Sequence, residues 1–362
     1  MTQPIDSSRR ITDPWAADPP PTRGSTAPAR DLDPSALPLG NVDIRAFLQA
    51  AGPACPAVVA PPPDVKTAAQ SKLDAYRDSF AGPYRVGGKE VSAPAQFRMP
   101  NGANDHAAGF YRKPDGTGDI HTDRSPTKEL FAICARGGAP SPRACLLGCP
   151  KAEDLVRVTQ ALLDAGRLED GPGDASMRIR AMQWKFGIGI DCTDYAVGAA
   201  MQAASKRPGD LPAGMRPSPG SDYFATAATN PHLKRVGLAT AQPGDVFCLD
   251  PVADPVGHRA VVYAAETCNA NRVLELGINF GPDAAKFLEG GPVRELELDA
   301  SWGAGKQGSS LGGVRRDVWL YNESSHAWAR IGPDLRTDSP AAFEVTPEGP
   351  NHERLHGIYR LQ

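Results

Sequence analysis

The sequence has no stretch that approaches the ~20 consecutive apolar residues of a membrane-spanning helix. It also has no basic stripe, and its formal net charge is only −3. We therefore expect neither a membrane span nor nucleic-acid binding. Residues 1–15 lack the apolar core of a secretory signal. We expect the protein to be made in the cytoplasm without such a signal, and any action in the periplasm or cell wall would then require export or injection.

The histidines, cysteines and acidic residues follow no spacing that is typical of a zinc site. We expect no metal ion and no other cofactor. The seven cysteines are an odd number, which is consistent with one free thiol. In an oxidising compartment Cys145 would pair with Cys149, or one of these two with Cys134, whereas in the cytoplasm none would pair.

Prolines are unevenly distributed, and 13 of the 36 lie in residues 1–65. Such a segment cannot bury enough apolar surface to offset chain entropy. We therefore expect residues 1–63 to be largely disordered. Residues 64–150, which begin with an expected helix at 64–80 and continue in short broken segments with hairpin signals, are interpreted as an accessory or cap region.

A clear amphipathic helix at 151–166 opens the next region. We expect a catalytic domain over 151–330 and a tail over 331–362. Within that domain we expect strands at 272–276, 293–298 and 314–321, arranged as an antiparallel meander. The fold class that follows is α+β.

The strongest chemical signal is the stretch 184–204, WKFGIGIDCTDYAVGAAMQAA. Glycines and short polar residues are followed by small helix-forming residues, which predicts that a helix begins at Cys192. A helix N-terminus stabilises a thiolate, and a nucleophilic cysteine needs that environment. A buried structural cysteine is the alternative.

A second stretch, 241–265, has a turn signal at 242–245 and then two short apolar runs. His258 opens the second run, so it stands at the start of an expected core strand. A cysteine at the start of a helix and a histidine at the start of a strand can meet as thiolate and imidazolium. On that interpretation the thiol of Cys192 would be unusually acidic.

These motifs resemble those of a known superfamily of cell-wall hydrolases. Asp191-Cys192-Thr193, Pro243-Gly244-Asp245 and Gly257-His258 followed by an apolar run resemble the NlpC-like peptidases. Cys192-Thr193-Asp194-Tyr195-Ala196 resembles the related CHAP amidases. The resemblance covers roughly residues 175–330. It implies a papain-like core, with a cysteine-bearing helix packed on an antiparallel sheet, and a substrate among the peptides of peptidoglycan.

Cysteine and histidine usually need a third polar group that orients the imidazole. Asp299, at the end of an expected strand, is our first choice, and Glu275 and Asn279, expected directly after the His258 strand, are the alternatives. The residues that would shape the substrate cleft are Trp184, Asp191, Thr193 and Tyr195. For Trp184, packing in the core is an equal alternative.

The resulting hypothesis is a cysteine amidase or endopeptidase that forms an acyl-enzyme on Cys192. A second hypothesis is a toxin that acts on a cytosolic protein, and a third is an inactive binding module. The partners implied are a peptidoglycan peptide, a secretion or contractile-injection apparatus, and an immunity protein.

Overall fold

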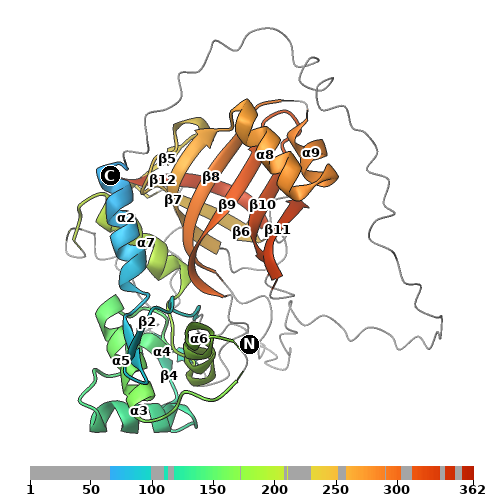
Figure 1. The fold of residues 1–362 in the computed structure, drawn as a ribbon. Coiled ribbons are helices and arrows are strands. Elements are labelled where there is room, and N and C mark those ends of the chain that lie inside the picture. Colours follow the sequence, from blue (N-terminus) through green and yellow to red (C-terminus); the bar gives the residue numbers. More distant parts are fainter. Residues whose placement is uncertain are drawn as a thin grey trace, which may run out of the picture. The chain divides into compact units, whose positions relative to one another are not determined.

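A computed structural model gives the fold of the chain (Figure 1). It describes residues 66–98, 110–112, 118–171, 173–207, 210, 230–251, 258–289, 291–302, 312–334, 339–346 and 353–362. The chain divides into two units, Met1–Val65 and Lys66–Gln362. The predicted disorder of residues 1–63 concerns a segment outside the described residues.

Local signals account for the start of several helices. Thr67 and Gln70 form a reciprocal capping box before the first described helix, and the side chain of Asp174 accepts from the amide of Met177 at the start of another. The described helices are α2 (Ala68–Ser79), α3 (Thr127–Arg136), α4 (Arg143–Leu146), α5 (Ala152–Asp164), α6 (Ala175–Phe186), α7 (Cys192–Ala203), the short 3-10 helix η4 (Leu238–Thr240), α8 (Ala270–Phe280) and α9 (Pro282–Leu288).

The described strands form two small hairpins and one large sheet. The hairpins are β1 (Tyr84–Val86) with β2 (Lys89–Val91), and β3 (Phe110–Arg112) with β4 (Gly118–Ile120). The large sheet has the order β11-β10-β9-β8-β7-β6-β12-β5, and every neighbouring pair in it is antiparallel. Its strands are β5 (Leu233–Val236), β6 (Val246–Pro251), β7 (His258–Thr267), β8 (Val293–Trp302), β9 (Gly313–Asn322), β10 (Trp328–Asp334), β11 (Ser339–Thr346) and β12 (Glu353–Leu361).

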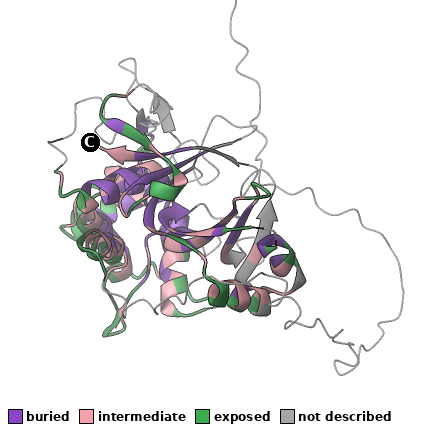
Figure 2. Cartoon of the chain, turned by 90° about the horizontal axis from the view of Figure 1, so that it is seen from above, coloured by how far each residue is buried: buried purple, intermediate pink, exposed green. Residues whose placement is uncertain are grey.

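Successive residues of a strand point to opposite faces of a sheet, and the two faces of this sheet have different cores. One face packs on α7, and we call it the helix face; its core includes Val246, Cys248, Val261, Tyr263 and Tyr359. We call the other the inner face; its core includes Phe247, Leu249, Val262, Leu298, Trp302, Trp319 and Trp328. Figure 2 shows the buried residues gathered along α7 and the sheet strands.

The inner face is curled around a tryptophan cluster. Phe247 on β6 and Trp328 on β10 have ring centroids 5.6 Å apart, although three strands separate β6 from β10 in the sheet. In a flat sheet four strand spacings of about 4.8 Å would hold them about 19 Å apart. Trp319 joins the two, with centroids 5.7 Å from Phe247 and 6.3 Å from Trp328. The curl lets these large side chains fill the interior.

Helix α2 packs on α7 through aromatic side chains and a glycine. Tyr76 and Phe80 of α2 both contact Tyr195 of α7, with ring centroids 5.5 and 5.9 Å away. A Cβ atom at Gly198 would lie 2.0 Å from the Tyr76 hydroxyl oxygen. Only glycine at this position allows the two helices to approach so closely.

The structure confirms the α+β class, the antiparallel sheet and the helices expected near 64–80, 151–166 and after Cys192. One expectation is wrong, because the segment expected as a strand at 272–276 lies in α8. Within 331–362, the region interpreted as a tail, β11 and β12 belong to the large sheet, and β12 lies between β6 and β5. Residues 66–150 and 151–362 fall within one compact unit.

Candidate active site

Cys192 is the first residue of α7, as the sequence predicts. Asp191 has extended backbone angles, φ −74° and ψ 154°, and its side chain accepts a hydrogen bond from the Thr193 amide at 2.8 Å. This is an N-cap, which ends the preceding loop and starts the helix. Gly187, with φ 64°, ends α6 and turns the chain into that loop. Cys192 is buried, with 4% of its surface exposed.

The loop before Cys192 is held by backbone hydrogen bonds on several sides. Ile190 exchanges bonds with the stretch 96–98, at 3.0 and 3.1 Å, and the amide of Asp191 donates to the Gly148 carbonyl at 2.7 Å. The Ser301 hydroxyl, on β8, donates to the Ile190 carbonyl at 2.7 Å. A Cβ atom at Gly189 would lie 2.1 Å from the Gln96 carbonyl oxygen. The position of the thiol is therefore fixed by a rigid surrounding.

The thiol of Cys192 lies against the start of β7. The backbone N–H of Arg259, the second residue of that strand, donates a hydrogen bond to the Cys192 sulfur. Two stretches 67 residues apart are thus joined at the point where the sequence places its two strongest motifs.

The imidazole of His258 lies on the inner face, away from α7. His258 is the register partner of Leu249, which belongs to the inner-face core. Its ring stacks on Trp302, with centroids 4.4 Å apart and an interplanar angle of 26°, and its Nε2 atom is buried without a hydrogen-bond partner. Arg259 is the register partner of Cys248, a helix-face residue. Neighbouring strand residues alternate between faces, so the His258 ring lies on the other side.

Cys192 and His258 are consequently not assembled as a pair in this structure. Burial raises the pKa of the Cys192 thiol well above its ordinary value, and the nearby Asp191 carboxyl adds to the rise. Burial, together with the nearby Arg259, Arg330 and Arg315, lowers the pKa of His258 to about 3. Both groups are neutral at pH 7. The expected thiolate–imidazolium pair and the expected acidic thiol are therefore wrong for this arrangement.

Asp299 lies on the helix face and does not orient His258. It is fully buried on β8 and forms a bidentate pair with Arg316, at 2.7 and 2.8 Å. Its register partner on β7 is Val261, a helix-face residue. The expected hydrogen bond from His258 to Asp299 is wrong, because the two side chains leave their strands in opposite directions.

Glu275 and Asn279 lie in α8 rather than on a strand after His258. Asn269 is the N-cap of this helix and accepts a hydrogen bond from the Arg272 amide at 2.9 Å. Glu275 is exposed and pairs with Arg272 at 3.0 Å, and Asn279 is exposed as well. Asn269 therefore starts a helix where the sequence predicted a strand at 272–276.

The residues expected to shape a cleft have different surroundings. Trp184 is buried in α6, with 8% exposure, which favours the packing alternative. Tyr195 is fully buried among the aromatic rings between α2 and α7, and its hydroxyl has no hydrogen-bond partner. Thr193 and Asp191 are half-buried at the start of α7.

The carboxyl of Asp191 occupies the amide donors at the start of α7. It accepts from the backbone N–H groups of Cys192, Thr193 and Asp194, while burial raises its pKa to about 6. The backbone N–H of a nucleophile often stabilises the oxyanion in acyl transfer, but the Cys192 N–H already has an acceptor in Asp191. Asp194 is buried, one of its oxygens has no partner, and burial together with Asp191 raises its pKa strongly.

Arg259 is the site residue that the sequence interpretation missed. It is 1% exposed, and its Nη1 donates to the carbonyls of Leu249 at 2.6 Å and of His258 at 2.9 Å. The signal that could have identified it is the two-residue period of the strand: once one residue of the pair 258–259 faces α7, the other cannot.

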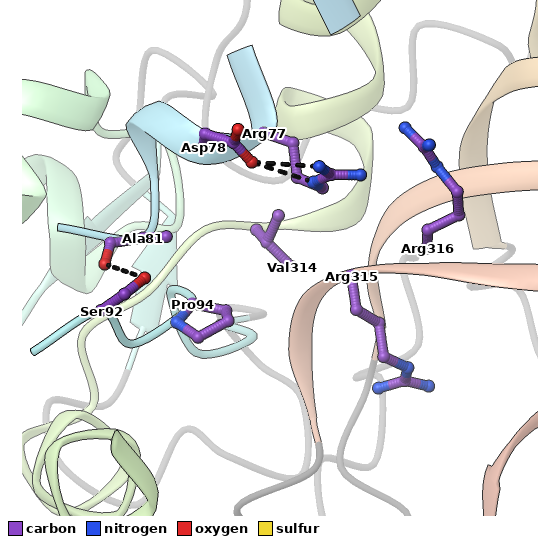
Figure 3. A pocket seen from close by; sticks show the side chains of 8 residues that line it. All are labelled: Arg77, Asp78, Ala81, Ser92, Pro94, Val314, Arg315 and Arg316. Carbon is purple, nitrogen blue, oxygen red and sulfur yellow. Dashed lines mark hydrogen bonds and ion pairs between the residues drawn. The ribbon is translucent and has the colours of Figure 1, made fainter. Parts of the chain in front are cut away.

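A pocket of about 320 Å³ lies elsewhere, between the end of α2 and the start of β9 (Figure 3). Its lining is Arg77, Asp78, Ala81, Ser92, Pro94, Val314, Arg315 and Arg316. Each of its arginines has an ion-pair partner: Arg77 has Asp78, Arg315 has Asp317, and Arg316 has Asp299. Neither Cys192 nor His258 lines this pocket, so we do not assign the chemistry to it.

The described cysteines, including Cys134, Cys145 and Cys149, are free thiols. No cluster of three or more histidine, cysteine or acidic side chains within the described ranges is arranged to hold a metal ion. No helix in that part of the chain combines the length and apolar character needed to cross a membrane.

Comparisons with protein-family models, with curated proteins and with solved structures find no match to this chain. The resemblance to cell-wall hydrolases therefore depends on the motif residues alone.

Proposed function

We propose that the protein is a cysteine amidase or endopeptidase with a papain-like core, and that Cys192 is its nucleophile. The observation that carries the proposal is the position of Cys192 at the first residue of α7. Its sulfur accepts a hydrogen bond from the backbone at the start of β7, and His258, the only histidine of that strand, lies at this same end. A helix N-terminus backed by a sheet is a rigid support for a nucleophile.

The reaction would be acyl transfer. His258 takes the proton of the Cys192 thiol, the sulfur attacks an amide carbonyl carbon, the C–N bond breaks, and the imidazolium gives that proton to the leaving amine. Water, deprotonated by His258, then hydrolyses the thioester and restores the thiol. This sequence requires the imidazole to leave Trp302 and reach the helix face, so the arrangement described above is a resting one.

The substrate class is a peptide of peptidoglycan, and the support for it is the resemblance of the motifs at 191–196, 243–245 and 257–258. Delivery by a secretion or contractile-injection apparatus, and protection of the producing cell by an immunity protein, would be consistent with such an activity.

A second candidate is a binding module that has lost catalysis. The placement of Cys192 and His258 on opposite faces favours it, as does the absence of a hydrogen bond between His258 and Asp299, two residues that the structure describes.

Incubation of purified sacculi with the protein, followed by mass spectrometry of the released peptides, distinguishes the two candidates. We expect cleavage by the wild type and by Cys248→Ala, a matched control at a fully buried strand cysteine, and at least a thousandfold loss in Cys192→Ala and His258→Ala. Intact sacculi with the wild type, together with retained peptide binding, would support the binding module instead.

A further inference from the structure

We propose that the pocket between the end of α2 and the start of β9 is a binding site for a small organic carboxylate, held by the guanidinium groups of Arg77 and Arg316. The pocket has a volume of about 320 Å³, at the lower end of the roughly 300–1,000 Å³ of small-molecule sites. Neither Cys192 nor His258 lines it, so the inference does not depend on the proposed function.

The two guanidinium groups come from different elements and lie on the same side of the sheet. Arg77 belongs to the last turn of α2, and Arg316 belongs to β9. Figure 3 shows both side chains on one side of β9, whereas the side chain of Arg315 points to the other side. Two planar, forked donors that line one pocket suit a carboxylate, whose two oxygens accept several N–H groups.

Arg316 is the donor that is already fixed in position. Its Nε and Nη2 atoms hold the buried Asp299 carboxylate at 2.7 and 2.8 Å, and Nη2 also donates to Asp74 at 3.0 Å. Its Nη1 lies 3.6 Å from Glu297 Oε2, which is too long for a hydrogen bond. The guanidinium is therefore oriented before a ligand arrives, and binding orders little that was free.

Arg77 is the donor whose present partner is easily displaced. Its Nε and Nη2 atoms share one oxygen of Asp78, at 3.2 and 3.1 Å, and its Nη1 donates to none of the residues that the structure describes. The Asp78 side chain is 67% exposed, and an ion pair with so exposed a partner contributes at most about 1 kcal/mol. A ligand carboxylate can therefore replace Asp78, which then turns to water.

The rest of the pocket narrows the class of ligand. Ala81, Pro94 and Val314 offer apolar contacts, which suit a short aliphatic side chain. The C-terminal end of α2 and the Asp78 carboxylate both oppose negative charge, so one negative charge fits better than the two of a phosphate. A peptide that ends in a free alanine carboxylate has both properties.

Isothermal titration calorimetry of the full chain measures the binding directly. The probe is N-acetyl-alanyl-alanine, and its C-terminal amide and inorganic phosphate are the comparison ligands. The variants are Arg77→Gln and Asp78→Asn. Arg136→Gln, at an exposed position in the last turn of α3 and outside the pocket, is the matched control, and circular dichroism checks the fold of each variant.

We expect the wild type to bind the acid at least about tenfold more tightly than the amide, because the amide cannot form charge-assisted hydrogen bonds with the arginines. Arg77→Gln should weaken binding of the acid by at least about tenfold for the same reason. Asp78→Asn should strengthen it about two- to threefold, because it removes a competing surface carboxylate. Arg136→Gln should leave the affinity unchanged.

Equal binding of acid and amide, no binding of the acid at millimolar concentration, or an unchanged affinity in Arg77→Gln would overturn the inference. A loss in Arg136→Gln would place the site elsewhere, and tighter binding of phosphate would contradict the class of ligand. If Arg77→Gln does not fold, Asp78→Asn decides, since only a carboxylate held by Arg77 gains from that change. Cleavage of sacculi by a chain that binds no carboxylate would retain the proposed function alone, and carboxylate binding without cleavage would retain this inference alone.

Discussion

The helix face and the inner face of the sheet differ in how their buried polar groups are paired. On the helix face Arg316 joins Asp299 and Asp74, and its guanidinium lies over the Tyr263 ring. On the inner face Asp317 lies between two arginines, and three aromatic nitrogens are buried without a hydrogen-bond partner: His258 Nε2, Trp302 Nε1 and Trp319 Nε1.

The difference shows what one residue of offset does in a strand. His258 and Arg259 are neighbours in the sequence, yet one lies in an aromatic stack that favours a neutral ring, and the other contacts the thiol at the start of α7. A motif identified by the order of its residues does not specify the face of the sheet on which each side chain lies. The following predictions break or sharpen this contrast, from the largest effect to the smallest.

Trp319→Ala should be one of the two most destabilising changes, at about 3–5 kcal/mol. Trp319 is fully buried at the centre of the inner face and contacts Phe247, Trp302 and Trp328. Urea unfolding followed by circular dichroism measures the loss. Met177→Ala, at an exposed position of α6, is the matched control and should change stability by less than about 0.5 kcal/mol.

Asp317→Asn should destabilise the protein by about 3–5 kcal/mol, because it leaves Arg315 and Arg330 buried without their shared carboxylate. Asp299→Asn should cost less, because Arg316 retains Asp74 at 3.0 Å. The same urea experiment compares the two. Equal losses of stability in Asp317→Asn and Asp299→Asn would mean that the two faces do not differ in how their buried arginines are paired.

The pH dependence of stability should differ between wild type and His258→Gln. The folded pKa of His258 is about 3, below the ordinary 6.5, so between these values the unfolded chain binds a proton that the folded chain does not. The contribution of His258 to the free energy of unfolding therefore rises with pH between about pH 3 and pH 6.5, by at most about 1.4 kcal/mol per pH unit.

Asp191 acts in the opposite sense. Its folded pKa is about 6, above the ordinary 3.8, so its contribution falls as pH rises between these values. We therefore expect the free energy of unfolding of His258→Gln, measured with urea, to fall as the pH rises from about 4 to about 6. A variant profile parallel to that of the wild type would show that His258 titrates normally.

Asp194→Asn should have the smallest effect, a modest gain in stability at pH 7. Burial and the nearby Asp191 raise the pKa of the Asp194 carboxyl well above its ordinary value. The folded protein therefore favours the neutral carboxyl, and a neutral amide removes the cost of binding that proton. The gain should vanish near pH 3, where the unfolded chain is protonated as well. A loss at pH 7 would indicate that Asp194 is ionised.

Local features of the fold could be predicted from the sequence, and several predictions are confirmed. The glycines and Asp191 before Cys192 act on their immediate neighbours, and the helix begins where they predict. The strand that starts at His258 is also confirmed, because the apolar run that predicts it is a local signal as well. The short apolar run at 272–276 is compatible with both a strand and a helix, and the cap at Asn269 decides for the helix.

Long-range features could not be predicted. The insertion of β12 between β6 and β5 depends on contacts between residues more than 100 apart. The choice of Arg259 over His258 as the neighbour of Cys192 depends on how α7 packs on β7, which no local pattern encodes. The prediction that Asp299 orients His258 is wrong for a similar reason, because no local pattern encodes the face of the sheet on which each side chain lies.

The most direct test of the separation between Cys192 and His258 is an NMR titration of the His258 imidazole in the full chain, in wild type and in Cys192→Ala. The separation predicts a His258 pKa of about 3 that stays within about 0.3 units in the variant, because its causes are burial and the arginines. A pKa above 7 in the wild type that falls by a unit or more in Cys192→Ala would show a thiolate–imidazolium pair and contradict it.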